Sequence, residues 1–364
     1  MNPTDYQAAG LYDPTSPNAA ERLELLEWLT GRNITIRQMQ QANARGQLPF
    51  VASTAIMRPG PYLTQQQLAD RLGITNEFLE TFRVAFALPP VAPDAPWCNE
   101  AEAEMFGAVA AGVGLFGPQG MLRLSRVLGS SVSRIAEAMA TTNAERMRAI
   151  VDTGATELQL AQANVAAVAT AGAPARIITG LLSIHLQLAA ARVRERRAKL
   201  ADETMNGCVG FVDLVGSTTL SRRLSARELA DFVERFEEVA HRIATNGRGR
   251  VVKFIGDEVM FVTGDAASGC KIALSLIEAF VGDPSVTPRA GLAAGALLDR
   301  GGDYYGPIVN LAARLAELAV PSEVLVSMEV ADHLAGSGLE CEPAGRRLLR
   351  GFDEPVSLMS VRRA

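Results

Sequence analysis

The chain has 364 residues, of which 48% are hydrophobic and 21% are charged, so it can form two or three domains with apolar cores. A net charge of −5 gives no argument for a nucleic-acid partner. The four cysteines lie far apart without a CxxC pattern, which argues against a disulfide framework or a zinc ribbon and fits a reducing compartment. Because there is no signal-peptide pattern and no apolar run of about 18 residues, we expect a cytoplasmic protein without a transmembrane segment.

The first half of the chain has a helical pattern. Residues 1–20 are polar and rich in proline and asparagine, which predicts a flexible arm. From residue 21 to about 190, apolar residues recur at three- and four-residue spacing, as in Met121–Ala140, while the alternation typical of strands is nearly absent. A further helix, Thr156–Arg197, is expected to break near Pro174. The sequence therefore predicts an all-α domain over residues 21–190, whose wide apolar faces must pack on one another or on a second subunit.

Thr64–Phe86 has the pattern of a helix-turn-helix, with Gly73 at the turn. As a DNA-binding motif, its second helix would offer two carboxylates, Glu77 and Glu80, and a single cation, Arg83. Two carboxylates that face phosphate are unfavourable for binding. The pattern therefore favours a helical hairpin packed inside the N-terminal domain over a DNA-binding motif.

A charged segment, residues 191–206, separates this half from a second domain over residues 207–364. Short apolar strands alternate there with amphipathic helices, which indicates an α+β or α/β domain. The expected strands are Gly207–Val215, two within Arg250–Val262, Arg289–Leu297 and Glu323–Ser327, and the expected helices are Ala226–Ala244, Ala266–Phe280 and Ile308–Leu318.

The first chemical motif in this domain is an aspartate, Asp213, at the end of an apolar strand. Gly216, Ser217 and Thr218 follow it and open a helix, so their backbone N–H groups suit phosphate. The carboxylate of Asp213 suits a hard cation such as Mg²⁺. Taken alone, however, Asp213 is better explained as the N-cap of that helix.

The second motif is a hairpin turn that contains Gly256 and Asp257, between two apolar strands. An aspartate in a turn is routine, so this motif says little by itself. Together with Asp213, however, it provides two carboxylates at strand ends of one small sheet. Such carboxylates can converge on a pair of divalent ions that activate an attacking hydroxyl and stabilise a leaving phosphate.

The third motif places Asn310 and Arg314 four residues apart, and hence on one face of a helix. An amide and a guanidinium together suit a sugar oxygen and a charged phosphoryl group. A solvated surface or a capping arrangement would also account for this pair.

In their order and spacing from about residue 207 to the end, these motifs resemble the class III nucleotidyl cyclases, of the bacterial class IIIc type. The resemblance implies a ferredoxin-like or palm-like βαββαβ domain that converts ATP to cyclic AMP and pyrophosphate with two divalent cations, Mg²⁺ or Mn²⁺, per site. It implies metal-binding roles for Asp213 and Asp257, purine-selecting roles for Lys253 and Asp303, transition-state roles for Asn310 and Arg314, and triphosphate contact by Arg350.

The choice of purine depends on Lys253 and Asp303. A lysine that donates to a ring nitrogen and a carboxylate that accepts from the exocyclic amine match the hydrogen-bonding edge of adenine. Guanine would leave both groups wrongly paired, and such a mismatch discriminates strongly. The resemblance also implies a head-to-tail homodimer with shared sites, in which Asp213 and Asp257 come from one subunit and the other site residues come from its partner.

The N-terminal half resembles the regulatory domain of mycobacterial-type cyclases. That resemblance implies a domain that dimerises, autoinhibits the catalytic half, and makes activity depend on pH or on a fatty acid, with residues 191–206 as the switch segment. His185, on the helix that leads into this segment, is a candidate pH sensor, and a buried neutral histidine is the alternative. The apolar run Phe106–Phe116 could line a lipid site or belong to the core.

Two other functions remain open at the level of sequence. The chain could be a catalytically silent module that senses nucleotide for signalling or transcription, with the helix-turn-helix-like part as its output. A diguanylate cyclase shares the βαββαβ core, but it needs a GGDEF-type turn, and the turn here reads FIGDEV.

Overall fold

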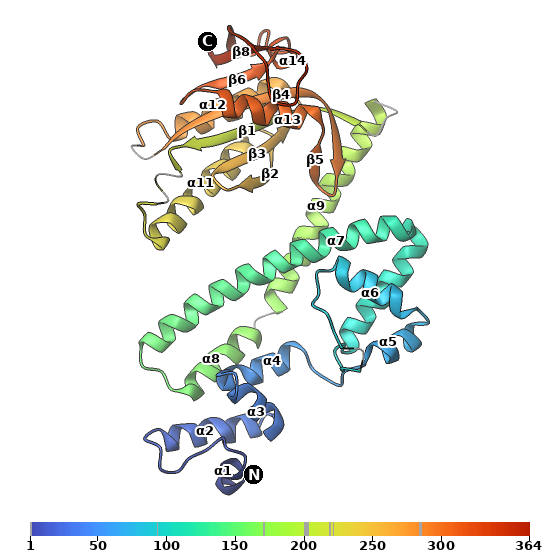
Figure 1. The fold of residues 1–364 in the computed structure, drawn as a ribbon, viewed down its shortest axis with the longest axis vertical. Coiled ribbons are helices and arrows are strands. Elements are labelled where there is room, and N and C mark those ends of the chain that lie inside the picture. Colours follow the sequence, from blue (N-terminus) through green and yellow to red (C-terminus); the bar gives the residue numbers. More distant parts are fainter. Residues whose placement is uncertain are drawn as a thin grey trace. The chain divides into compact units, whose positions relative to one another are not determined.

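The computed structural model describes residues 2–92, 94–169, 172–199, 204–217, 220, 222–283 and 286–364 (Figure 1). The chain divides into two compact units, Met1–Ala191 and Arg192–Ala364. The N-terminal unit consists of helices joined by loops, and the C-terminal unit combines helices with a mixed sheet. The fold class predicted from the sequence is therefore confirmed.

The helices begin almost at the start of the chain, so the predicted flexible arm over residues 1–20 is wrong. Tyr6 is 1% exposed because it packs with Leu25 and Leu26 in one apolar core, and its hydroxyl lies 2.6 Å from Oγ1 of Thr30. The sequence pattern of residues 1–20 does not indicate the burial of Tyr6, because its partners lie on the following helix. The first helices are α1 (Pro3–Ala8), α2 (Ala19–Thr30), α3 (Ile36–Asn43), the 3₁₀ turn η1 (Leu48–Phe50) and α4 (Val51–Met57).

The helix-turn-helix pattern forms α5 (Gln65–Leu72) and α6 (Asn76–Ala85), with Gly73 in the left-handed conformation between them. Phe82 of α6 packs with Phe106 in the second apolar core of the N-terminal unit. Arg83, the one cation expected to face DNA, is 7% exposed and forms an ion pair with Glu80. The prediction of a hairpin packed inside the domain is thus confirmed.

The next helix, α7 (Glu100–Asp152), is longer than predicted and breaks at Gly117, which has φ 69° and ψ 162° and precedes a proline. The run Phe106–Phe116 starts in the core and ends at the surface, since Phe106 is 0% and Phe116 58% exposed. Beyond the break, one face of α7 carries a row of exposed apolar side chains at three- and four-residue spacing: Leu124, Leu128, Val132, Ile135 and Met139.

Two more helices follow, α8 (Glu157–Ala169) and α9 (Gly172–Lys199). His185 is exposed on α9, so the alternative of a buried histidine is wrong for the single chain. The predicted linker, residues 191–206, is helical as far as Lys199 and becomes a strand at Thr204.

Two helical stretches, Glu100–Asp152 and Glu157–Arg194, are long and apolar enough to cross a membrane by length and composition alone. The structure describes the second of them except for residues 170 and 171. Helices of soluble proteins can share these properties, so the expected lack of a transmembrane segment stays a prediction.

The C-terminal unit is built on a sheet whose described strands run in the order β2-β3-β1-β4-β6-β8-β7, with β5 paired to β4. Strands β1 to β4 are antiparallel neighbours and form, with α11 and α12, the predicted βαββαβ core. The elements are β1 (Thr204–Val215), α11 (Ala226–Asn246), β2 (Arg250–Ile255), β3 (Glu258–Thr263), α12 (Ala266–Ala279), β4 (Thr287–Arg300), β5 (Asp303–Tyr305), α13 (Pro307–Leu318), β6 (Val324–Ser327), α14 (Met328–Ala331), β7 (Leu339–Arg347) and β8 (Val356–Arg363).

Side chains on the two faces of this sheet belong to separate apolar cores because strand residues alternate between faces. Val212 and Phe261 pack with α11 and α12, whereas Phe211 and Met260 pack with α13. The helix with the predicted transition-state residues therefore lies on the face opposite α11 and α12.

Candidate active site

Asp213 lies near the end of β1, between its two neighbouring strands. Its Cα is paired with that of Glu258 on β3 and with that of Arg289 on β4. After β1, Gly216 takes a φ of 97°, a left-handed value that glycine adopts without strain. The N–H of Leu220 donates to the carbonyl of Gly216 at 2.9 Å, so a helical turn opens here, as the sequence predicts.

Asp257 lies in the tight turn that joins β2 to β3. The hydroxyl of Ser217 donates to Oδ2 of Asp257 and so links the segment after β1 to this turn. Because Glu258 is the cross-strand partner of Asp213, the two predicted metal-binding aspartates lie at the same end of the sheet. Thr218, the last residue of the predicted phosphate-binding segment, lies outside the described residues.

This end of the sheet gathers negative charge. Burial, followed by the charges of Asp213 and Glu317, raises the pKa of Glu258 to about 7. Among the described residues, no group of three or more His, Cys, Asp and Glu side chains could hold a metal by itself. One or two carboxylates that share Mg²⁺ with substrate phosphates are the usual arrangement in nucleotide sites. The donor chemistry therefore fits divalent cations that bind together with a nucleotide.

Arg289 is a residue of this site that the sequence did not indicate. Its Nε donates to Oδ2 of Asp213 at 2.8 Å, and its Nη2 lies 2.7 Å from the same oxygen. Its Nη1 donates to the carbonyl oxygens of Glu317 at 2.6 Å and Ala319 at 3.3 Å. Arg289 thus connects the end of β1 with the C-terminal end of α13.

Lys253 on β2 and Asp303 on β5 contact each other directly. Nζ lies 2.5 Å from Oδ2, and the two side chains are 38% and 26% exposed. Oδ1 of Asp303 accepts from the N–H of Tyr304 at 2.8 Å, which fixes the carboxylate. The pair therefore presents an ammonium and a carboxylate side by side, where both can bind the polar edge of a ligand.

The two predicted transition-state residues lie on α13. This helix packs so closely on β4 that a Cβ at Gly291 would lie 2.0 Å from the backbone N of Ala316. Asn310 is exposed. The guanidinium of Arg314 binds Glu317, with Nη1 2.6 and 2.7 Å from the two carboxylate oxygens. Arg314 is thus held on the helix surface in the single chain.

Arg350 lies in the exposed turn that follows β7. In the described part of the chain, it forms no hydrogen bond or ion pair with the other predicted site residues. The structure thus brings Asp213 close to the turn of Asp257, and Lys253 to Asp303, whereas among the described residues it shows no contact of Arg350 with them.

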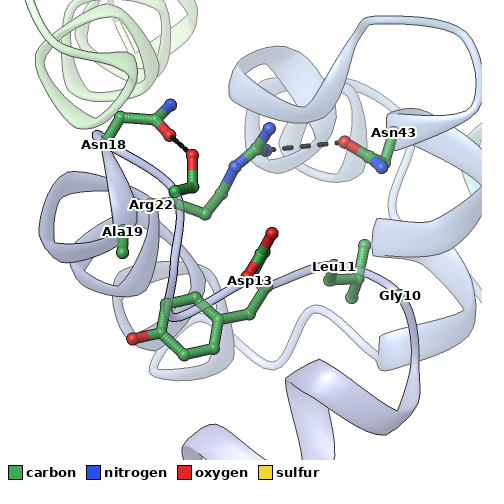
Figure 2. A pocket seen from close by; sticks show the side chains of 9 residues that line it. Gly10, Leu11, Asp13, Asn18, Ala19, Arg22 and Asn43 are labelled. Atoms are coloured by element: carbon green, nitrogen blue, oxygen red, sulfur yellow. Dashed lines mark hydrogen bonds between the residues drawn. The ribbon is translucent and has the colours of Figure 1, made fainter.

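The N-terminal unit contains a hollow of about 320 Å³ between the loop after α1 and helix α2 (Figure 2). Arg22 reaches across it, with Nη1 3.5 Å from Oδ1 of Asn43 and Nε 3.2 Å from Oε2 of Glu157. Asp13 and Asn18 add further polar groups to its wall. An acyl chain needs a predominantly apolar wall, so this hollow suits a small polar ligand better than a fatty acid.

Comparison with known proteins divides the chain at the same place as the two compact units of the structure. Residues 4–189 match the family described as the adenylate cyclase regulatory domain, and residues 200–359 match the adenylate and guanylate cyclase catalytic domain. A protein of Mycobacterium tuberculosis named pH-sensitive adenylate cyclase is 32% identical over 362 residues, which cover 94% of this chain and 88% of that protein.

Two further proteins match less than half of the chain. An adenylate cyclase of Streptomyces coelicolor is 40% identical over 151 residues, which are 41% of this chain and 40% of that protein. The crystal structure of the adenylyl cyclase CyaB from P. aeruginosa is 25% identical, with a TM-score of 0.40, and covers 44% of this chain and 96% of that one. The match to the catalytic-domain family, together with the βαββαβ core, identifies residues 200–359 as a class III nucleotidyl cyclase domain. The chain belongs to the family of adenylate cyclases that carry an adenylate cyclase regulatory domain before the catalytic domain.

Proposed function

We propose that the chain converts ATP to 3′,5′-cyclic AMP and pyrophosphate in two equivalent sites shared between the subunits of a head-to-tail homodimer. The ribose 3′-hydroxyl attacks the α-phosphorus in line, and pyrophosphate leaves. The observation that carries the choice of ATP is the contact between Lys253 and Asp303. In this proposal the lysine donates to a ring nitrogen of adenine while the carboxylate accepts from the exocyclic amine.

Asp213 and Asp257 would hold two divalent cations, Mg²⁺ or Mn²⁺. When bound, such cations lower the pKa of the attacking hydroxyl and offset the charge of the leaving group. Burial raises the pKa of Glu258 most, and the charges of Asp213 and Glu317 raise it further. This second contribution supports the assignment, because a cation would relieve the repulsion between the carboxylates. The backbone N–H groups of the segment from Gly216 through Ser217 to Thr218 would bind the phosphates.

Asn310 would orient the ribose and Arg314 would meet the charge that develops on the α-phosphate oxygens. The exposure of Asn310 supports a role in a site completed by a second subunit. To act there, Arg314 must exchange its contact with Glu317 for the phosphate. Arg350 would add a cation for the triphosphate, a role that rests on the resemblance alone.

The N-terminal unit would dimerise and restrain the catalytic domains, roles that rest on its resemblance to the regulatory domain of mycobacterial-type cyclases. The exposed apolar row on α7, from Leu124 to Met139, supports dimerisation because a second copy could cover it. The mycobacterial relative is named a pH-sensitive adenylate cyclase, which favours pH over a fatty acid as the signal, and His185 on α9 is the candidate sensor. We place the enzyme in the cytoplasm, where its substrate is.

The test is a cyclic AMP assay on the purified chain with ATP or GTP and with Mg²⁺ or Mn²⁺. Formation of cyclic AMP from ATP, lost on removal of the metal, is the expected result. A chain that binds ATP but forms no cyclic AMP under any of these conditions would instead support a nucleotide-sensing module. Comparing activity across pH for the wild-type chain and a His185→Gln variant tests the sensor.

A further inference from the structure

Arg289 uses its whole guanidinium to join two parts of the catalytic domain. Nε and Nη2 bind Oδ2 of Asp213, and Nη1 binds the carbonyl oxygens of Glu317 and Ala319. The side chains of Arg289 and Asp213 are only 25% and 20% exposed, so the ion pair is partly shielded from water. A forked contact of this kind fixes the orientation of a carboxylate as well as its charge.

The contact with α13 has its own physical reason. The last carbonyl groups of a helix have no partner within the helix, and a cation near them is also favoured by the helix dipole. Arg289 supplies both a donor and a positive charge at this point, close to the end of α13. The same guanidinium therefore caps the helix that carries Asn310 and Arg314 and holds the aspartate on β1.

We propose that Arg289 is a positioning residue that ties the carboxylate of Asp213 to the end of α13. This inference rests on the proposed function, in which Asp213 serves one active site of the dimer while Asn310 and Arg314 of the same chain serve the other. Arg289 then couples the metal-binding side of one site to the transition-state side of the second. Arg289 donates to Oδ2 of Asp213, and in this proposal Oδ1 would bind the metal ion.

The first test measures Mn²⁺ binding by electron paramagnetic resonance in the presence of 3′-deoxy-ATP, which lacks the attacking hydroxyl. Arg289→Lys keeps the positive charge but loses the two guanidinium nitrogens that hold Asp213. It should therefore weaken Mn²⁺ binding about 10-fold, as is typical when a residue that orients a metal ligand is replaced. The matched control is Arg363→Lys, because Arg363 also makes forked contacts, with Glu278 at 2.5 Å, but lies on β8. Equal Mn²⁺ binding by the two folded variants would overturn the proposal.

If Arg289→Lys does not fold, hydrogen exchange on Asp213→Asn decides instead. Without the carboxylate, Arg289 loses one of its two anchors, and the backbone amides of the last turn of α13 should exchange faster than in the wild-type chain. The amides of α12 serve as the internal control. Unchanged exchange in α13 would show that the two contacts are independent, and the proposal would fail.

The second test shows the direction of the coupling in mixed dimers. One subunit carries Asn310→Ala and the other Asp257→Ala, so that a single site keeps all its residues. Arg289→Lys in the subunit that supplies the aspartates should raise the metal concentration for half-activation about 10-fold. In the other subunit it should lower kcat by a similar factor and leave the metal requirement unchanged, because only α13 is disturbed.

These outcomes separate the proposal from its alternatives. A merely structural role for Arg289 predicts the same loss from either placement, and that result would overturn the coupling. If the parent mixed dimer is inactive while the wild-type chain forms cyclic AMP, the shared-site proposal fails. Mn²⁺ binding and hydrogen exchange would still decide whether Arg289 positions Asp213.

Discussion

Lys253 and Asp303 are separated by 50 residues in the chain, yet Nζ of the lysine lies 2.5 Å from Oδ2 of the aspartate. The contact depends on two strands that lie far apart in the sheet order, β2 and the short β5, and on the hydrogen bond that holds Asp303 to its own neighbour Tyr304. One donor and one acceptor are thereby set side by side, as a purine edge requires.

Replacing both Lys253 and Asp303 should change which nucleotide the enzyme prefers. With Lys253→Glu and Asp303→Cys together, we expect kcat/KM for ATP to fall at least about 100-fold and GTP to become the better substrate, because unpaired polar groups reject the wrong base strongly. Lys271→Glu, a charge reversal at an exposed lysine of α12, is the control and should leave the preference for ATP unchanged. Retained ATP preference in the double variant would show that the pair does not contact the base.

The aspartates at the end of the sheet should make catalysis depend on metal. We expect EDTA to abolish activity, excess Mg²⁺ or Mn²⁺ to restore it, and Asp213→Asn or Asp257→Asn to lower kcat by about 100-fold or more. Asp332→Asn, at an exposed aspartate beyond α14, is the control and should keep full activity. Full activity of either site variant at low metal concentration would remove that residue from the metal site.

Packing of α13 on the sheet should be sensitive to a single methyl group. A Cβ at Gly291 would lie 2.0 Å from the backbone of Ala316, so Gly291→Ala must push α13 away from β4. We expect a loss of about 3 kcal/mol in the free energy of unfolding, and a fall in kcat of about 100-fold because Asn310 and Arg314 move. Gly264→Ala is the matched control, since no atom lies within 4 Å of its Cβ position. Equal unfolding midpoints in urea for the two variants would contradict this packing.

The ion pair of the helical hairpin should contribute to stability rather than to DNA binding. Arg83 is 7% exposed, pairs with Glu80 and donates to the carbonyl of Leu88 at 2.5 Å, so Arg83→Ala should lower the Tm of the protein by about 3–8 °C. The exposed pair of Arg71 with Glu100 provides the comparison, and Arg71→Ala should lower the Tm less. Tight, salt-dependent binding of a DNA duplex that Arg83→Ala abolishes would revive the DNA-binding interpretation.

The features that sequence reasoning predicted depend on near neighbours in the chain. The hairpin of α5 and α6 follows from the capping box of Thr64 with Gln67 and from the left-handed Gly73. The turn of Asp257 between two strands follows likewise from Gly256. Such signals are local, so one sequence is enough to read them.

The features that were missed depend on contacts between distant segments. Arg289 meets Asp213 only through the register of β1 with β4, which periodicity does not give. Tyr6 becomes buried only because it packs on the apolar face of α2, which the polar sequence of residues 1–20 does not indicate. The sequence pattern does not predict strands β7 and β8, because β7 is largely exposed and its pairing with β8 shifts register between Pro343 and Gly345.

The shared active site is the central claim, and mixing two inactive variants tests it most directly. Asp257→Ala lacks a metal ligand and Asn310→Ala lacks a transition-state residue, so each homodimer should form almost no cyclic AMP. After subunit exchange, half of the dimers are mixed and each has one intact site of two, so the mixture should recover roughly a quarter of wild-type activity. A mixture that stays inactive, although both variants dimerise and exchange subunits, would contradict the shared site.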